Sequence, residues 1–219
     1  MLPTTKARKV AMGWLIIPPQ KCLGGTMAIH SGELLGKIWR RCKRYYHLWF
    51  CRQNYIFKYD GPILPQQRSD CKYESYESFD ELPEHVKVDI CADGDASRLE
   101  ADKLELGENA ILWVAFIDGC VATTVFTRKG KHFRRWFLDL QPADVVVFRL
   151  RTLPVFRGRG LAPALIRHAI YAQSGTDKSG QAYIDCRTYN KTSKRCIEKA
   201  GFKCVATKKA IKREWTLYD

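Results

Sequence analysis

Apolar and polar positions alternate with short periods through the second half of the chain. Apolar runs at 110–117 and 120–127 flank Asp118-Gly119, a dipeptide typical of two-residue hairpin turns. The pattern beyond this hairpin predicts further strands and two helices: strands at 132–138, 144–153, 181–187 and within 205–218, and helices at 163–174 and 192–199. Strands followed by alternating helices and strands indicate an α/β domain built on a mixed sheet.

The first half of the chain contains fewer clear elements. Apolar side chains recur at helical spacing within residues 31–52, with Lys and Arg on the other side, which predicts a basic amphipathic helix. Residues 54–59 are aromatic and β-branched and predict a first strand. Residues 60–79 are expected to form a loop. Two acidic helices, at 81–88 and 95–106, are expected to lie on the surface and to carry no chemistry.

The amino terminus indicates a leader ahead of the folded domain. Residues 1–30 are expected to be disordered, and translation from Met27 is an alternative to translation from Met1. The apolar run at 10–17 is short and lacks a good cleavage pattern, which argues against a secretory signal. The folded domain is therefore expected at 53–219, and no apolar stretch is long enough for a transmembrane helix.

The 219 residues carry a net charge of +14 that is unevenly spread. Residues 1–59 sum to +10, residues 60–110 to −9 and residues 111–219 to +13. The basic parts favour a partner with phosphate groups: a nucleotide cofactor, a lipid headgroup or RNA. Nucleic acid ranks last, because a phosphate-rich cofactor explains the basic carboxyl half. The basic segment 34–52 is compatible with an anionic membrane surface, although packing on the domain is the commoner role of such a helix.

Cysteine and histidine usage argues against a metal site. Nine cysteines are scattered without a C-x-x-C pair, and five histidines are present. Zinc sites need closely spaced ligands, so we expect no metal. An odd set of scattered cysteines indicates reduced thiols in a cytoplasmic protein, peripheral to the inner face of a membrane if the basic segment binds lipid.

The stretch 154–166 carries the clearest chemical signal in the chain. It places two glycines and two arginines between an apolar strand and an apolar helix. Glycine lets the backbone turn tightly and approach a ligand, and a helix amino terminus offers unpaired N–H groups to an anion. The stretch therefore predicts a pyrophosphate site, although such a turn also serves plain packing.

Two motifs resemble the GNAT superfamily of N-acetyltransferases. Residues 157–162 read Arg-Gly-Arg-Gly-Leu-Ala and match the R/Q-x-x-G-x-G/A signature of that family. Residues 190–202 begin with Asn and end with Glu-Lys-Ala-Gly-Phe, which is similar to the family's N-x-x-A-x-x-L-Y-E-K-L-G-F segment. The resemblance covers roughly residues 105–215 and implies a mixed, mostly antiparallel sheet flanked by helices.

This resemblance implies a coenzyme A site at the strand–helix junction. The backbone at the strand's end would hydrogen-bond the pantetheine arm: Leu150, Arg151 and Thr152. The turn and the first helical residues would hold the pyrophosphate: Arg157, Gly158, Arg159, Gly160, Leu161 and Ala162. Asn190 would contact the pantetheine or separate the two strands. Three cations are candidates for the 3′-phosphate, each weighed against a solvated helix face: Lys191, Lys194 and Arg195.

The catalytic groups are less well defined. Where the family often places a tyrosine as general acid, this chain has Ile197, which cannot transfer a proton. Tyr189 is a candidate substitute, and solvent is another, since a thiol with a pKa of roughly 8.5 is a tolerable leaving group. Asp185 is a candidate base, although an ion pair with Arg187 or Arg167 is its commoner role. We assign no catalytic acid or base from the sequence.

Taken with the resemblance, the sequence predicts a coenzyme-A-dependent N-acyltransferase. Acetyl-CoA would be the co-substrate and a primary amine the acceptor, in a direct transfer. A small-molecule amine, a sugar nucleotide and a protein amino group all remain open as acceptors. The alternative is a non-catalytic module that binds acyl-CoA as a sensor or scaffold. Whether His132, Phe133 and Trp136 line an acceptor pocket or form an aromatic strand is also open.

Overall fold

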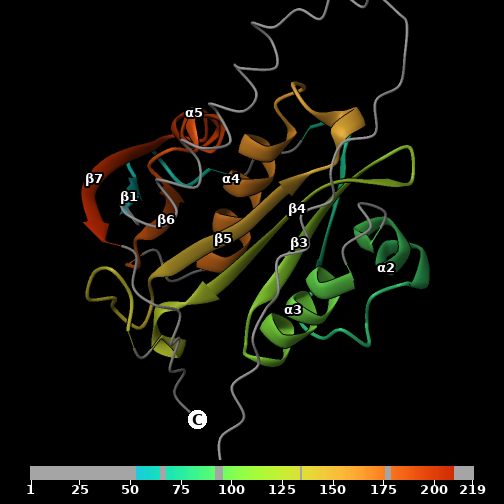
Figure 1. The fold of residues 1–219 in the computed structure, drawn as a ribbon, viewed down its shortest axis with the longest axis horizontal. Coiled ribbons are helices and arrows are strands. Elements are labelled where there is room, and N and C mark those ends of the chain that lie inside the picture. Colours follow the sequence, from blue (N-terminus) through green and yellow to red (C-terminus); the bar gives the residue numbers. More distant parts are fainter. Residues whose placement is uncertain (1–52, 65–67, 92–95, 134, 176–178, 210–219) are drawn as a thin grey trace, which may run out of the picture. The chain divides into compact units, whose positions relative to one another are not determined.

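The computed structural model describes residues 53–64, 68–91, 96–133, 135–175 and 179–209 (Figure 1). These residues belong to one compact unit, Arg41–Asp219. The leader expected at 1–30 and the basic helix expected at 31–52 lie outside the described residues. None of the described helices is long and apolar enough to cross a membrane.

In the described part of the chain, seven strands form one sheet in the order β2-β3-β4-β5-β6-β1-β7. Their bounds are β1 Gln53–Tyr59, β2 Lys72–Tyr76, β3 Ile111–Ile117, β4 Cys120–Lys129, β5 Val145–Thr152, β6 Ala182–Arg187 and β7 Phe202–Lys209. Neighbouring strands are antiparallel except β5 and β6, which are parallel. The expected mixed, mostly antiparallel sheet is confirmed, and the hairpin over Asp118-Gly119 joins β3 to β4.

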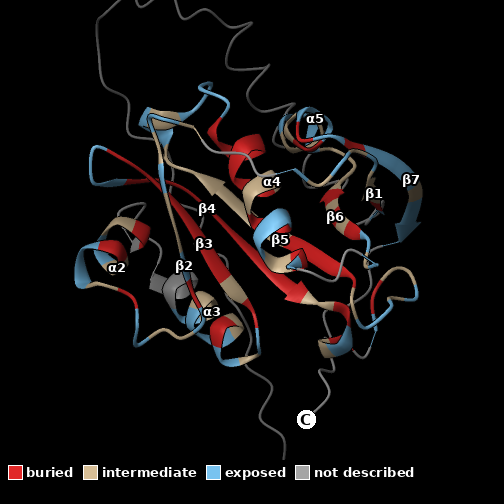
Figure 2. Cartoon of the chain, turned by 180° about the vertical axis from the view of Figure 1, so that it is seen from behind, coloured by how far each residue is buried: buried red, intermediate tan, exposed pale blue. Residues whose placement is uncertain are grey.

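Helices cover both faces of this sheet. Their bounds are α2 Glu84–Cys91, α3 Ala96–Gly107, α4 Leu161–Ser174 and α5 Lys191–Lys199. Figures 1 and 2 show α2 and α3 on one face and α4 on the other. Along β3, Trp113 packs in the core beneath α4, together with Leu165. Its neighbour Leu112 packs on the opposite face with Val86 of α2, as the two-residue period of a strand requires.

The described residues of the segment 132–138 do not form the expected strand. A 3₁₀ turn starts at Gly130, whose N–H donates to the Asp144 carbonyl oxygen at 2.7 Å. Close backbone packing favours glycine at this point, since a Cβ would lie 2.0 Å from a carbonyl oxygen. After the turn, the side chains of Phe133 and Trp136 pack into a core, so their aromatic pattern reflects burial and not a strand.

The stretch 60–79, expected to be a loop, contains the edge strand β2. This strand pairs with β3 alone, and its sequence is polar with two tyrosines. An edge strand exposes one side of its backbone to solvent and tolerates polar residues, so its composition resembles that of a loop. The other expected elements lie within a few residues of their predicted bounds. Residues 210–219, where a last strand was possible, are outside the described residues.

The parallel pair β5–β6 opens along its length. Register pairs join Val145, Val146 and Val147 to Ala182, Tyr183 and Ile184. Beyond these pairs β5 continues to Thr152 and β6 to Arg187 without pairing to each other. Backbone N–H and C=O groups require partners, so the two diverging edges can hydrogen-bond a ligand between them. The site described below lies around this opening.

Packing beneath α4 is tested by two leucine substitutions. Leu165 is fully buried, whereas Leu104 on α3 is 63% exposed. We expect Leu165→Ala to lower the free energy of unfolding by about 2–5 kcal/mol because it leaves a cavity, and Leu104→Ala to change it by less than about 0.5 kcal/mol. Urea denaturation of both variants measures these effects. Equal losses in the two variants would contradict the described core.

Candidate functional site

A β-bulge interrupts β5 where this strand leaves β6. Between Phe148 and Arg151 the strand takes three residue steps while its partner β4 takes two. Within the bulge, Arg149 has a φ of 53°, in the left-handed region that few non-glycine residues adopt. A bulge bends its strand and leaves local ladder groups unpaired. The backbone of β5 is therefore least regular at the opening between β5 and β6.

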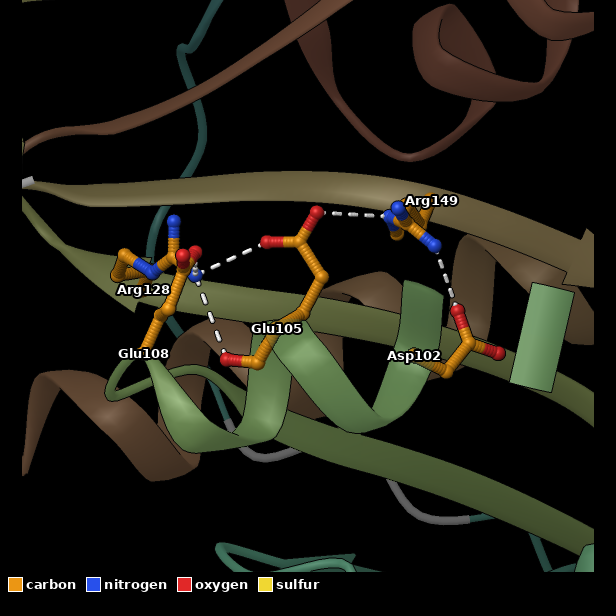
Figure 3. Close-up of polar contacts among 5 residues, drawn as sticks. All are labelled: Asp102, Glu105, Glu108, Arg128 and Arg149. Atoms are coloured by element: carbon orange, nitrogen blue, oxygen red, sulfur yellow. Dashed lines mark hydrogen bonds and ion pairs between the residues drawn. The ribbon is translucent and has the colours of Figure 1, made fainter. Parts of the chain in front are cut away.

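Carboxylates of α3 hold the bulged residue (Figure 3). Arg149 Nη1 lies 2.7 Å from Asp102 Oδ1, and Arg149 Nε lies 2.9 Å from Glu105 Oε1. The second oxygen of Glu105 lies 2.9 Å from Nη2 of Arg128, a side chain that is 2% exposed. Glu108 approaches the same nitrogen at 3.4 Å. Glu105 thus bridges two arginines, and these ion pairs tie α3 to β4 and β5.

Burial changes the acid–base properties of this cluster. It raises the pKa of Asp102 and of Glu108, against the opposing effect of their arginine partners. The Arg128 guanidinium lies over the rings of Phe133 and Phe148, 5.5 and 5.3 Å from the centroids. The expectation that this helix lies on the surface and carries no chemistry did not include these partly buried ion pairs of α3. Its partners are separated in sequence by 20 residues or more, so local pattern gave no signal of them.

The glycine loop, residues 157–162, leads from the end of β5 into α4. Gly158 and Gly160 have φ values of 81° and 73°, which glycine adopts without a steric penalty. Gly160 is the N-cap of α4, so the N–H groups of the next residues have no intrahelical partner. Arg157 folds back along the loop, and its Nε donates to the Thr152 carbonyl oxygen at 3.1 Å. The loop therefore combines free N–H groups with the positive end of a helix dipole.

Sequence reasoning missed Arg68, from the segment between β1 and β2. Its Nη1 donates to the carbonyl oxygen of Arg159 at 2.8 Å, and so braces the glycine loop. Two hydrogen bonds to Asp70 hold the guanidinium in place and lower the pKa of that carboxyl to about 2. Arg68 and Arg159 are 91 residues apart, so no local motif could indicate the contact.

A cavity of about 580 Å³ lies beside the glycine loop; we call it the loop cavity. Most of the predicted coenzyme A residues line it: Leu150, Arg151, Thr152, Arg157, Gly158, Gly160, Leu161, Ala162, Asn190 and Arg195. Three others do not. Arg159 lies over the ring of Phe156, Lys194 lies over the ring of Tyr55, and Lys191 is exposed. Lys199, which the sequence did not single out, also lines the cavity.

A second cavity of about 380 Å³ has an aromatic wall and a charged wall; we call it the aromatic cavity. The aromatic wall is formed by Phe133, Trp136, Phe137 and Phe148. The charged wall is formed by Glu105, Arg128, Arg149, Asp185 and Arg187. Leu150, Asn190 and Ser193 line both cavities, which therefore meet where β5 and β6 diverge. Of the three aromatic residues left open above, His132 does not line it.

The catalytic candidates occupy different surroundings. Ile197 is fully buried in the core beneath α4, and Tyr189 lines neither cavity. Asp185 lines the aromatic cavity and accepts a hydrogen bond from the side-chain amide of Asn54. Asn190 caps α5, where its Oδ1 accepts from the Ser193 N–H at 3.1 Å. Of the two catalytic candidates, Tyr189 and Asp185, the fold brings Asp185 to a cavity.

Neither cysteine near the opening is suited to nucleophilic attack. Burial raises the pKa of the Cys186 thiol to about 12 and also raises the pKa of Cys196. The attacking species of cysteine is the thiolate, so both thiols are unreactive near neutral pH. Among the described residues, no group of three metal-ligating side chains comes together.

A known protein family matches this chain. The model of the Acetyltransferase (GNAT) family matches residues 72–202, which is more than half of the chain. A search of curated proteins gives no match.

Solved structures also align with the chain. A putative GNAT acetyltransferase from Novosphingobium aromaticivorans is 19% identical over 71% of this chain and 61% of its own, with a TM-score of 0.49. This chain thus spans about three fifths of that protein. A GNAT-family acetyltransferase from Colwellia psychrerythraea is 13% identical over 86% and 74%, with a TM-score of 0.48. AAC(6′)-Iy, in complex with a bisubstrate analogue of coenzyme A and acetylneamine, is 23% identical over 62% and 92%, with a TM-score of 0.46.

The bridging role of Glu105 is testable by substitution. We expect Glu105→Gln to lower the free energy of unfolding by about 2–4 kcal/mol, because the buried Arg128 guanidinium loses its nearest charged partner. The exposed Glu100, on the same helix, is the matched control, and Glu100→Gln should change stability by less than about 0.5 kcal/mol. Urea denaturation at pH 7 measures both. If the two variants are equally stable, the cluster does not hold α3.

Proposed function

The chain belongs to the GNAT acetyltransferase family, and from this premise we propose that it is a coenzyme-A-dependent N-acyltransferase that moves an acetyl group from acetyl-CoA directly to a small primary amine. The observation that carries the proposal is the meeting of the loop cavity and the aromatic cavity at Leu150. A donor bound along the glycine loop and an acceptor in the aromatic cavity would reach each other there. Holding two reactants in such proximity is a major source of rate enhancement.

The residues of the loop cavity fit coenzyme A. Two positive-φ glycines without a Cβ and the first-turn N–H groups of α4 suit a pyrophosphate. The β5 backbone at 150–152, unpaired on the side of β6, suits the amide groups of pantetheine. Arg195 and Lys199 line the same cavity and suit the 3′-phosphate. When bound, acetyl-CoA supplies the acetyl group as a thioester.

Backbone groups of β5 would orient the reacting carbonyl. A main-chain N–H within 149–152 would donate a hydrogen bond to the carbonyl oxygen, where negative charge develops during acyl transfer. Preorganised donors of this kind are among the largest contributions to acyl-transfer catalysis. The bulge is therefore the element on which the proposed chemistry depends.

The acceptor amine must lose a proton before it attacks, and we assign Asp185 as the group that receives it. Two carboxylates line the aromatic cavity, Asp185 and Glu105. Both oxygens of Glu105 are already engaged in ion pairs with Arg128 and Arg149. Asp185 lies on the opposite side of the opening, on β6. No described tyrosine lines either cavity, so the proton for the departing thiolate is left to solvent.

A second function is favoured by one observation. Because Ile197 is buried and none of the described tyrosines lines either cavity, a protein that retains acyl-CoA without turnover is the alternative. The two functions differ in one readout: an acyltransferase releases free thiol when an amine is supplied, whereas a binding module does not.

Acetyl-CoA binding is tested with two glycine substitutions. Gly160 and Gly119 both have positive φ, so Gly160→Trp and Gly119→Trp carry similar backbone strain. Gly160 lines the loop cavity, whereas Gly119 lies in the β3–β4 turn. We expect isothermal titration to show acetyl-CoA binding by wild type and Gly119→Trp, and at least a 30-fold weaker affinity for Gly160→Trp. Circular dichroism checks that both variants fold. Equal affinities would place the coenzyme elsewhere.

Direct transfer predicts that no cysteine carries the acetyl group. Since burial raises the pKa of Cys186 to about 12, we expect Cys186→Ala to retain turnover within about threefold of wild type. Mass spectrometry of the protein after incubation with acetyl-CoA alone should show no added acetyl group on Cys186 or Cys196. A stable acetyl-cysteine, together with loss of turnover in Cys186→Ala, would replace direct transfer by a two-step mechanism.

A further inference from the structure

The charges of the aromatic cavity are unevenly partnered. Arg128 and Arg149 are held by carboxylates of α3 and by Glu108, which follows that helix. Arg187, which lines the same cavity and is half-buried, forms no side-chain hydrogen bond or ion pair with any residue in the described part of the chain. A half-buried guanidinium without a partner loses hydration and gains little in return. Its charge is therefore available to a ligand.

Some buried polar atoms of the residues in this wall also lack a hydrogen-bond partner. Trp136 Nε1 and Arg128 Nε are both buried and have no hydrogen-bond partner in the structure. On the acceptor side, the corresponding buried group is Asn54 Oδ1. These atoms are fully buried, so a ligand in the cavity does not contact them, whereas the half-buried Arg187 guanidinium is accessible to a ligand.

Asp185 and Arg187 present opposite charges from one face of β6. They are two residues apart, and side chains at that spacing point to the same face of a strand. Their Cα atoms are separated by about 6.6 Å, from a rise of about 3.3 Å per residue. Asp185 suits an ammonium group and Arg187 suits a carboxylate. The pair thus matches a molecule that carries both groups close together.

The size of the aromatic cavity and its unpaired charge restrict the acceptor to a smaller class of molecules. The cavity of about 380 Å³ has four aromatic rings in its wall, which suits one apolar side chain. Arg128 and Arg149 are paired with carboxylates, so Arg187 is the arginine of this cavity whose charge has no ion pair in the described part of the chain. A carboxylate on the acceptor would supply the ion pair that Arg187 lacks.

We propose that the acceptor is an amino carboxylate, such as an apolar or aromatic amino acid, whose carboxylate is bound by Arg187 and whose amine lies at Asp185. This inference rests on the proposed function. Arg187 is a specificity-determining residue in it and takes no part in acetyl-CoA binding, since it lines the aromatic cavity and not the loop cavity.

The experiment compares L-amino acids with the amines that lack their carboxylate. The pairs are L-phenylalanine with phenethylamine and L-leucine with isopentylamine, and release of coenzyme A thiol from acetyl-CoA is the readout. We expect kcat/KM to be at least 10-fold higher for the amino acids. Arg187→Met should lower kcat/KM for L-phenylalanine at least 10-fold, through KM, as expected for loss of a charge-assisted hydrogen bond. Arg187→Lys should restore part of it.

Two readouts separate this role from a structural one. The KM for acetyl-CoA and the rate with phenethylamine should be unchanged in Arg187→Met. Arg135→Met is the matched control, because Arg135 is exposed and lines neither cavity. Equal use of the paired amines, or an equal loss for both in Arg187→Met, would overturn the proposal.

The carboxylate site can be tested even if the proposed acyltransferase function fails. If acetyl-CoA does not bind, the acyltransferase proposal fails, and titration of the protein with L-phenylalanine and phenethylamine tests the aromatic cavity directly. Binding of L-phenylalanine that is at least 10-fold tighter than that of phenethylamine, and that Arg187→Met abolishes, supports the carboxylate site. Absence of binding for every amino acid in a panel of apolar and aromatic L-amino acids would overturn it.

Discussion

The site depends on one departure from regular strand pairing. The parallel strands β5 and β6 stay together for three register pairs and then separate, and the bulge at Arg149 bends β5 at that point. Regular pairing would satisfy the backbone groups of both strands internally. The separation leaves them available, and the glycine loop and both cavities are arranged around it. In the proposed function, the acyl donor and the amine would meet at this point, where the sheet is incomplete.

Electrostatic contacts maintain this departure. A non-glycine residue in the left-handed region is strained by about 1–2 kcal/mol, and Arg149 stays there with its guanidinium held by Asp102 and Glu105. Glu105 also holds Arg128, which lines the aromatic cavity. One carboxylate therefore connects the backbone of β5 to the wall where the acceptor would lie. Buried charges are tolerated only with partners, so these residues form a unit and not a set of independent contacts.

The sequence predicted elements whose signals are local. The hairpin at Asp118-Gly119, the strand before the glycine loop and the helix after it were all found close to their expected bounds. The wrong predictions have two causes. The aromatic segment 132–138 has a strand-like composition, but its side chains fill a core after a glycine turn. The edge strand β2 has a loop-like composition, because edge positions face solvent.

By itself the sequence determined the glycine loop and its place between a strand and a helix, because glycine, proline and arginine act there through neighbouring residues. Tertiary structure alone decided which distant groups meet at the opening. Arg68 reaches the loop from 91 residues away, and the carboxylates of α3 reach Arg149 from 44 or more residues away. Arg187 was a possible ion-pair partner of Asp185, but it forms no ion pair in the described part of the chain and lines the aromatic cavity. Contacts between distant segments depend on how strands and helices pack. The spacing of residues along a short stretch of sequence does not predict that packing.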